Sequence, residues 1–365
     1  MPLPRTGIWI AGATGRTGRA LTRRLLETTD HEITLLGRDA GRLERASADL
    51  PRPVRTAVHP DLAAAAEAVR HGRPLVLVNL AGDYRGSTVP LARATLPGGH
   101  YVDLANDLRV LEELRTLDAD ARAAGSTLVT GAGFGVLATE ALVVRLTRGL
   151  PTPASVQVDA LGSSATQDGE TGEAFAASVV DVLTTGGREF RGGELVRTRL
   201  AARAERFTLP DGTTVASASA PSAELLAAHL ASGAPDVVAT SGLVPAQRVV
   251  RALLPLAGRA LSIPALRRAA VSRLARTRTQ AAARPRPHSW GRAVVVWPDG
   301  SRREGWLRAG DAMEFTGEVL LAVTRRVADG RTDPGVHTPA GACGPDVAEE
   351  AGARLSPAEP APPRR

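Results

Sequence analysis

Three glycines at three-residue intervals separate an apolar strand from a helix at the start of the chain, an arrangement that few folds accommodate. The run Gly7–Ala11 is apolar, Gly12, Gly15 and Gly18 follow it, and a helical pattern covers Thr17–Glu27. The first two glycines permit a tight turn whose backbone N–H groups can approach an anion. The third lets the helix pack closely on the strand. At the head of a series of strand–helix units, this turn predicts a dinucleotide-binding α/β sheet.

Short apolar runs alternate with helical patterns over the first 150 residues. Near-continuous apolar strands are typical of a parallel sheet with helices on both faces, so we expect a doubly wound α/β domain. The predicted strands are Gly7–Ala11, Glu32–Leu36, Val54–Val58, Leu75–Leu80, Tyr101–Leu104 and Thr127–Thr130, and the predicted helices are Thr17–Glu27, Asp61–His71, Val89–Thr95 and Leu108–Ala124.

Period-two alternation replaces this pattern after Pro153 and predicts a second domain of the α+β type. The turns at 210–212 and 298–300 both read Pro-Asp-Gly, which favours hairpins. The residues from 356 onward are rich in Pro, Ala and charge and predict a disordered tail. The predicted strands are Ser155–Leu161, Val196–Leu209 and Arg292–Trp297, and the predicted helices are Thr171–Thr184, Pro245–Gln280 and Asp311–Ala328.

The chain contains no lysine, so all 45 of its basic residues are arginines. Schiff-base chemistry, a P-loop and a Tyr-x-x-x-Lys reductase dyad each need a lysine and are excluded. The single cysteine, Cys343, can form neither an intrachain disulfide nor a cysteine metal cluster, which predicts a reducing, cytoplasmic location. No apolar run approaches the roughly 18–20 residues that cross a bilayer, and no spacing of ligands predicts a metal site.

The residues that end the second and fourth strands indicate which cofactor the turn would hold. The second strand ends at Gly37 and Arg38, where an arginine accommodates the 2′-phosphate of NADP(H), while Asp39 could instead reach a ribose hydroxyl. The fourth strand runs into a turn of small residues, 79–82, next to the topological switch point, and an amide there would hydrogen-bond a ribose hydroxyl. The predicted NADP(H)-binding residues are Gly12, Thr14, Gly15, Arg16, Thr17, Gly18, Arg38, Asn79, Ala81 and Gly82.

The order of these motifs resembles the saccharopine-dehydrogenase-like NADP-binding domain. The resemblance spans roughly residues 7 to 350 and is weakest from 185 to 290. Asp83 stands where the family usually has a proline. The matching segments are Gly12–Gly18, Leu36–Asp39, Val78–Gly82, Gly99–Asp103, Ala121–Gly125, Val129–Gly135, Gly310–Asp311, Gly335–Pro339 and Cys343–Pro345.

This resemblance implies a nicotinamide-dependent oxidoreductase with a Rossmann domain and an α+β domain for substrate binding or dimerisation. It further implies that a C-terminal helix returns to the first domain. We therefore expect a Rossmann domain at 1–135, an α+β domain at 136–310, the returning helical segment at 311–350 and the disordered tail at 351–365.

Hydride transfer usually needs a proton donor near the reacting carbon, and polar side chains at strand ends are the candidates. Tyr84 and Tyr101 are the only tyrosines and both lie beside expected cleft edges, so they are the predicted catalytic acids, with packing as the alternative for Tyr101. The glycine-dense segment 129–135 is expected to line the substrate cleft, or else to serve only as a linker. The other polar or aromatic candidates are Asp83, His100, Asp103, His288, Trp290 and His337.

One stretch of the chain concentrates its positive charge. Residues 237–298 contain eleven arginines and no acidic residue, whereas the whole chain carries only +7. The segment 245–292 would suit an acidic partner, such as a carrier protein, or an anionic membrane surface. The alternative is a solvated face that pairs with acidic residues in a homodimer. Aromatic residues make up only 3% of the chain and no recognition motif accompanies the charge, so nucleic acid is not expected as a partner.

Taken together, the sequence predicts a cytoplasmic NADPH-dependent oxidoreductase that reduces a C=C, C=O or C=N bond of a small or carrier-bound substrate. A protein that binds NADP(H) without turnover and regulates a partner is the alternative, because the chain lacks lysine and shows no clear acid–base pair.

Overall fold

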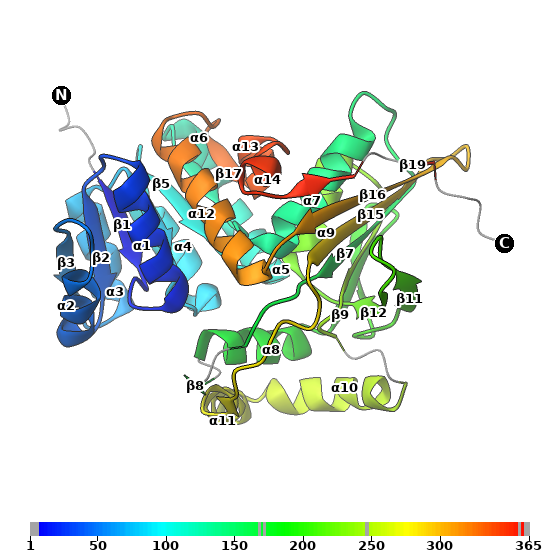
Figure 1. Ribbon diagram of the computed structural model, residues 1–365, viewed down its shortest axis with the longest axis horizontal. Helices are drawn as coiled ribbons and strands as arrows, with labels where there is room; N and C mark the ends of the chain where they lie inside the picture. The colour runs from blue at the N-terminus through cyan, green and yellow to red at the C-terminus, as the bar shows by residue number, and fades with distance from the viewer. Residues whose placement is uncertain (1–6, 167–168, 171–172, 245–247, 357–358, 361–365) are drawn as a thin grey trace. The chain divides into compact units, whose positions relative to one another are not determined.

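A computed structural model describes residues 7–166, 169–170, 173–244, 248–356 and 359–360. The chain divides into two compact units (Figure 1). Unit 1 contains residues up to Ala105, then Arg109–Gly133 and Thr316–Val347, and unit 2 contains Asn106–Leu108, Phe134–Phe315 and the residues from Ala348 onward.

Unit 1 is built on a seven-stranded sheet in the order β17-β6-β5-β4-β1-β2-β3, in which every pairing is parallel. The order reverses between β1 and β4, so the carboxyl ends of these two strands form the topological switch point. The doubly wound sheet expected from the sequence is confirmed. The strands are β1 (Ile8–Ala11), β2 (Ile33–Gly37), β3 (Arg55–Val58), β4 (Val76–Asn79), β5 (His100–Asp103), β6 (Thr127–Val129) and β17 (Gly335–His337).

Helices cover this sheet, and several begin at an aspartate that follows a strand or loop. The carboxylates of Asp39, Asp61 and Asp83 accept hydrogen bonds from backbone N–H groups in the first turns of α2, α3 and α4. Such caps satisfy donors that a helix start leaves unpaired. The helices are α1 (Arg16–Thr28), α2 (Ala40–Ala48), α3 (Leu62–Gly72), α4 (Tyr84–Thr95), α5 (Leu108–Arg115), α6 (Asp118–Ala123), most of α12 (Ala312–Ala328) and α13 (Pro339–Cys343).

Unit 2 is built on a ten-stranded mixed sheet whose central path is β10-β9-β13-β7-β15-β16-β18. Both Pro-Asp-Gly turns form the predicted hairpins, and their glycines, Gly212 and Gly300, adopt positive φ values. The ten strands are β7 (Ser155–Leu161), β9 (Gly187–Arg191), β10 (Glu194–Thr198), β11 (Ala204–Thr208), β12 (Thr214–Ser219), β13 (Asp236–Ser241), β15 (Ser289–Val296), β16 (Arg302–Ala309), β18 (Arg354–Leu355) and β19 (Glu359–Pro360). Two further short strands, β8 (Gly169–Glu170) and β14 (Arg278–Thr279), pair with each other in a separate sheet.

Two buried helices pack on this sheet, and a separate helical layer lies apart from them. Helix α7 contacts β7, β15 and β16, and a side chain at Gly291 of β15 would place its Cβ 3.0 Å from Ala138 of the helix. Helix α9 contacts β13, β7 and β9, whereas α8 packs with α10 and α11 around Val180 and Val271. The helices are α7 (Phe134–Thr147), α8 (Glu173–Thr185), α9 (Ala223–Ser232), α10 (Arg248–Leu261), α11 (Pro264–Ala275) and α14 (Val347–Glu350).

Three predicted elements are each interrupted in the structure. The segment 196–209 is not one strand, because residues 199–203 separate β10 from β11. The helix predicted at 108–124 breaks between α5 and α6, and the one at 245–280 breaks at Ile263, which the following proline holds in an extended conformation. Residues 245–247 lie outside the described residues.

In the predicted disordered tail, Arg354–Leu355 and Glu359–Pro360 pair with β16 as β18 and β19. The unpaired edge of β16 supplies backbone partners that the composition of the tail does not reveal. Residues 357–358 and 361–365 lie outside the described part of the chain.

Candidate functional site

The glycine turn between β1 and α1 is shaped by two glycines that cannot be replaced without moving backbone. A Cβ at Gly12, whose φ is +76°, would lie 2.3 Å from the carbonyl oxygen of Leu80. A Cβ at Gly18 would lie 2.5 Å from the carbonyl oxygen of Gly12. Gly15 is different, because it is exposed and its Cβ would come no closer than 3.4 Å to any other atom. The side of the turn at Gly15 is therefore open.

Helix α1 begins at this open side without a capping side chain or an acidic residue in its first turn. Its N-cap residue is Gly15, no side chain caps it, and its first turn contains no acidic residue. The positive end of the helix dipole and the backbone N–H groups of the first turn thus remain for an anion. Thr14 and Thr17 are half-buried here, and Arg16 is exposed. The sequence-predicted loop residues lie together, in an arrangement that suits a pyrophosphate.

At the end of β2, Arg38 and Asp39 differ in their contacts. The Oδ1 atom of Asp39 accepts a hydrogen bond of 2.9 Å from the backbone N–H of Arg42, because Asp39 is the N-cap residue of α2. Arg38 is exposed at the tip of the strand. The carboxylate of Asp39 therefore caps α2, and the exposed guanidinium of Arg38 lies where it could bind a phosphate.

Asn79 occupies a different position from the one its predicted contact with ribose requires. Its side chain is fully buried. The Nδ2 group donates to the hydroxyls of Ser87 and Tyr101, at 2.9 Å each, and the Oδ1 atom accepts from the backbone N–H of Ala81 at 3.1 Å. Asn79 therefore fixes the Ala81–Gly82 turn from inside and presents no polar atom to a ligand. Ala81 is exposed and Gly82 has a φ of +89°.

Beneath this turn lies a buried carboxylate held by hydroxyl and amide donors. Asp103, at the end of β5, is fully buried. Its Oδ2 atom accepts from the hydroxyls of Thr88 and Tyr101 at 2.8 Å each, and its Oδ1 atom accepts from Thr130 at 2.6 Å and from the backbone N–H of Ala105 at 3.0 Å. Burial raises the pKa of Asp103, and these hydrogen bonds oppose that rise. The network ties α4, β5 and the end of β6 together at the carboxyl edge of the sheet.

The two predicted acids differ in access. The Tyr101 hydroxyl is fully buried between Asn79 and Asp103, and burial raises its pKa well above the ordinary value. Tyr101 is therefore a packing and network residue, which was the alternative interpretation. Tyr84 is half-buried at the first position of α4, and its pKa is raised by burial and by the charge of Asp103. Of the two, only Tyr84 retains access to solvent.

The other polar candidates make structural contacts. The Nδ1 atom of His100 accepts from the backbone N–H of Thr127 at 3.0 Å, and His337 contacts the carbonyl oxygen of Asp333. His288 lies edge-on to Trp290, whose Nε1–H donates to Asp211 at 3.2 Å. Within the part of the chain that the structure describes, no three His, Cys, Asp or Glu side chains gather as metal ligands. No helix among the described residues has the length and apolar character needed to span a membrane.

Unit 2 contains a buried acid that the sequence did not single out. Glu224, in the first turn of α9, is 4% exposed, and its Oε1 atom accepts from Asn106 at 2.9 Å. Its Oε2 atom is buried and has no hydrogen-bond partner among the described residues. Burial raises the pKa of Glu224. A Cβ at Gly135 would overlap Oε1, so any larger residue at the last glycine of the segment 129–135 would displace this carboxyl group.

A second group missed by the sequence analysis is a buried arginine on the sheet of unit 2. Arg292 of β15 is 4% exposed and contacts three carboxylates: Glu304 at 2.8 Å, Asp159 at 3.4 Å and Glu205 at 3.9 Å. Its guanidinium also lies 4.3 Å from the ring centre of Phe207. These partners come from three other strands, β7, β11 and β16, so only the folded sheet brings them to Arg292.

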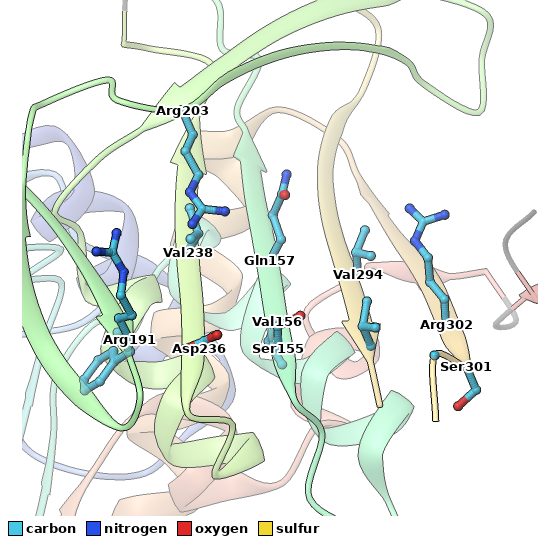
Figure 2. Close-up of a pocket in the computed structure, with 13 residues that line it drawn as sticks. Ser155, Val156, Gln157, Arg191, Arg203, Asp236, Val238, Val294, Ser301 and Arg302 are labelled. Atoms are coloured by element: carbon cyan, nitrogen blue, oxygen red, sulfur yellow. The ribbon is translucent and has the colours of Figure 1, made fainter. Parts of the chain in front are cut away.

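A hollow of about 820 Å³ lies on the same sheet. Figure 2 shows Gln157 on its floor, with Arg191 and Arg203 to one side and Arg302 to the other. Arg191 and Arg203 both pair with Glu189, and Arg302 pairs with Glu304. With Asp236 also in the lining, the hollow and its paired carboxylates carry no excess charge. We assign it no ligand.

The fold of unit 1 and the turn between β1 and α1 define a dinucleotide-binding protein. Residues 8–129 match the family model described as the Saccharopine dehydrogenase NADP binding domain. This match confirms, for the N-terminal domain, the resemblance inferred from the motifs, and it indicates an NAD(P) cofactor.

One solved structure supports the fold over nearly the whole chain, and two others are similar to a lesser degree. The apo histidine-tagged saccharopine dehydrogenase (L-Glu forming) from Saccharomyces cerevisiae matches with a TM-score of 0.59 and 12% sequence identity, over 96% of this chain and 100% of that chain. A dehydrogenase from Chromobacterium violaceum matches with a TM-score of 0.40 and 10% identity, over 96% and 93% of the two chains. Serine dehydrogenase from Escherichia coli matches 34% of this chain and 80% of its own, with a TM-score of 0.30 and 20% identity. No curated protein matches the chain in sequence.

Proposed function

We propose that this chain is an NADPH-dependent oxidoreductase that reduces a C=C, C=O or C=N bond of a small or carrier-bound substrate. The observation that carries the proposal is the uncapped start of α1 above the Gly12–Gly18 turn, with the exposed Arg38 at the end of β2 and the neighbouring carboxylate of Asp39 capping α2. The residues present fit an NADP(H) molecule. The match of residues 8–129 to an NADP-binding family supports the same cofactor.

The chain would hold the cofactor through three neighbouring elements. The first turn of α1 and the backbone at Gly15 would bind the pyrophosphate, and Arg38, with Arg16, would bind the 2′-phosphate. The Ala81–Gly82 turn, fixed from inside by Asn79, would support the ribose on the nicotinamide side. Bound in this way, the reduced nicotinamide supplies a hydride.

Tyr84 is the proposed proton donor. This residue is half-buried at the start of α4 and retains access to solvent, so a substrate can reach it. With Tyr101 internal, this is the remaining member of the predicted pair. A Tyr84→Phe variant should bind NADPH normally and turn over more slowly.

The cofactor assignment is tested by comparing NADPH and NADH affinities by titration calorimetry. Arg38→Ala should weaken NADPH binding by about tenfold or more and leave NADH binding nearly unchanged, because only NADPH carries the 2′-phosphate. Arg45→Ala is the matched control, since Arg45 is an exposed arginine on the neighbouring helix α2. Equal weakening of both cofactors by Arg38→Ala would contradict the assignment.

A second function, binding of NADP(H) without turnover, is favoured by one observation. Tyr101, half of the predicted acid pair, is wholly internal. Such a sensor would bind NADPH tightly and reduce none of a panel of enones, imines and ketones. Steady consumption of NADPH with any of these substrates would instead establish the reductase.

A further inference from the structure

Helices α10 and α11 have one face fixed against α8, so their opposite face is known. A Cβ at Gly258 of α10 would lie 2.4 Å from the carbonyl oxygen of Leu183, which shows how closely α10 approaches α8. On α11, Arg267 donates to Asp181 of α8 at 2.7 and 3.0 Å, and Val271 is 8% exposed in the core of this layer. Figure 1 shows the three helices as a layer of their own.

The opposite face exposes large apolar side chains. Leu256 is 62% exposed, Ile263 is 53% exposed and Leu266 is 46% exposed. Among the described residues, only Leu243, in the loop that leads towards α10, is a more exposed large hydrophobic residue than Leu256 and Ile263. Folding leaves these side chains in water, and their clustering over two helices is unusual, because exposed apolar residues normally occur singly.

The same face is rich in arginine and lacks acid. Arg259, Arg268 and Arg273 are exposed on it, and residues 237–298 contain no aspartate or glutamate. We call the exposed residues 256, 257, 259, 260, 263–266, 268, 269, 272 and 273 the Arg–Leu face. Arg267 of α11 pairs with Asp181 of α8 on the inner side of this layer. The exposed arginines have no carboxylate within residues 237–298 to pair with.

We propose that the Arg–Leu face docks on an anionic lipid bilayer, with α10 and α11 lying in the plane of the interface. Helices of this kind place leucine and isoleucine at the boundary of the acyl chains while arginines contact lipid phosphates, so a bilayer satisfies both halves of the face at once. An acidic protein would neutralise the arginines, but nothing on this face indicates a matching polar rim. Single-stranded nucleic acid would need aromatic stacking residues, and 254–276 contains none. The inference does not depend on the reductase activity.

Co-sedimentation of the full chain with vesicles tests this surface. Vesicles of equal parts phosphatidylglycerol and phosphatidylcholine should bind the protein at low salt and release it as salt rises, whereas pure phosphatidylcholine vesicles should bind it far less. Arg268→Glu with Arg273→Glu should weaken binding by about tenfold or more. Leu256→Ser with Ile263→Ser should bind the anionic vesicles more weakly than wild type, and salt should release this variant completely.

Two matched controls lie elsewhere on the chain. Arg197→Glu changes an exposed arginine of β10, and Val58→Ser changes a 45% exposed valine of β3. Neither should alter vesicle binding, and circular dichroism checks that every variant is folded. Absence of binding to the anionic vesicles, or equal loss with the controls, overturns the proposal. Binding of the wild type to polyglutamate but not to vesicles overturns it in favour of an acidic protein partner.

Discussion

Alanine at Gly18 would place a methyl group where the backbone of the glycine turn already lies. Its Cβ would be 2.5 Å from the carbonyl oxygen of Gly12, 2.7 Å from the Cα of Ala13 and 2.9 Å from the Ala13 carbonyl carbon. Backbone atoms cannot swing aside like the end of a side chain, so helix α1 must shift. Because all three clashes are with backbone, overpacking here should cost about 2–3 kcal/mol, the upper part of its usual range, against a gain of about 1 kcal/mol from alanine inside a helix.

The net loss of roughly 1–2 kcal/mol should lower Tm by about 2–8 °C in a unit of this size, as measured by calorimetry without cofactor. Gly15→Ala is the matched variant in the same turn. The φ of Gly15 is −73° and its Cβ would meet nothing closer than 3.4 Å, so Tm should change much less. Its methyl group would, however, stand in the proposed path of the pyrophosphate and weaken NADPH binding by about tenfold or more.

The two variants should therefore have different effects: Gly18→Ala should mainly lower stability, and Gly15→Ala should mainly lower the affinity for NADPH. An unchanged Tm for Gly18→Ala would refute the packing argument. Wild-type NADPH affinity in Gly15→Ala would refute the placement of the pyrophosphate on the open side of the turn.

Three further predictions concern buried groups. Burial raises the pKa of Glu224 in the folded state. The stability linked to its proton is therefore complete below the unfolded pKa of about 4.3 and is lost as pH rises through the folded pKa. The Tm advantage of Glu224→Gln over wild type should grow from pH 4 to pH 8, and a constant difference would contradict this. Arg292→Met leaves three carboxylates without their shared cation and should cost about 3–5 kcal/mol in urea unfolding, whereas a loss below about 1 kcal/mol would show that the carboxylates are neutral or rearrange. Tyr101→Phe should cost about 1–3 kcal/mol through its lost hydrogen bonds and leave turnover per folded molecule unchanged; a selective fall in kcat would return Tyr101 to the chemistry.

Much of unit 1 is predictable from the chain alone, because its signals are local. The glycine spacing, the apolar strands and the strand–helix alternation each act within about thirty residues, and they predicted all six strands from β1 to β6. The hairpin turns of unit 2 were predictable for the same reason. Elements whose pattern is set by distant neighbours were not, such as the fully buried start of α9 or the strands β18 and β19 that depend on the edge of β16.

The sequence by itself determined the class of fold, the turn that would hold a pyrophosphate and the arginine at the end of β2. Tertiary structure decided which polar residues face a ligand. Asn79 and Tyr101 stand on strands where a ligand contact was expected, yet both are buried: Asn79 donates to Tyr101, and Tyr101 donates to Asp103. Arg292 and Glu224 look like ordinary charged residues in the chain and prove to be buried. Whether a polar side chain is buried, and which groups it hydrogen-bonds, depends on residues far apart in sequence. Local patterns therefore give its position along a helix or strand but not whether it faces solvent or the core.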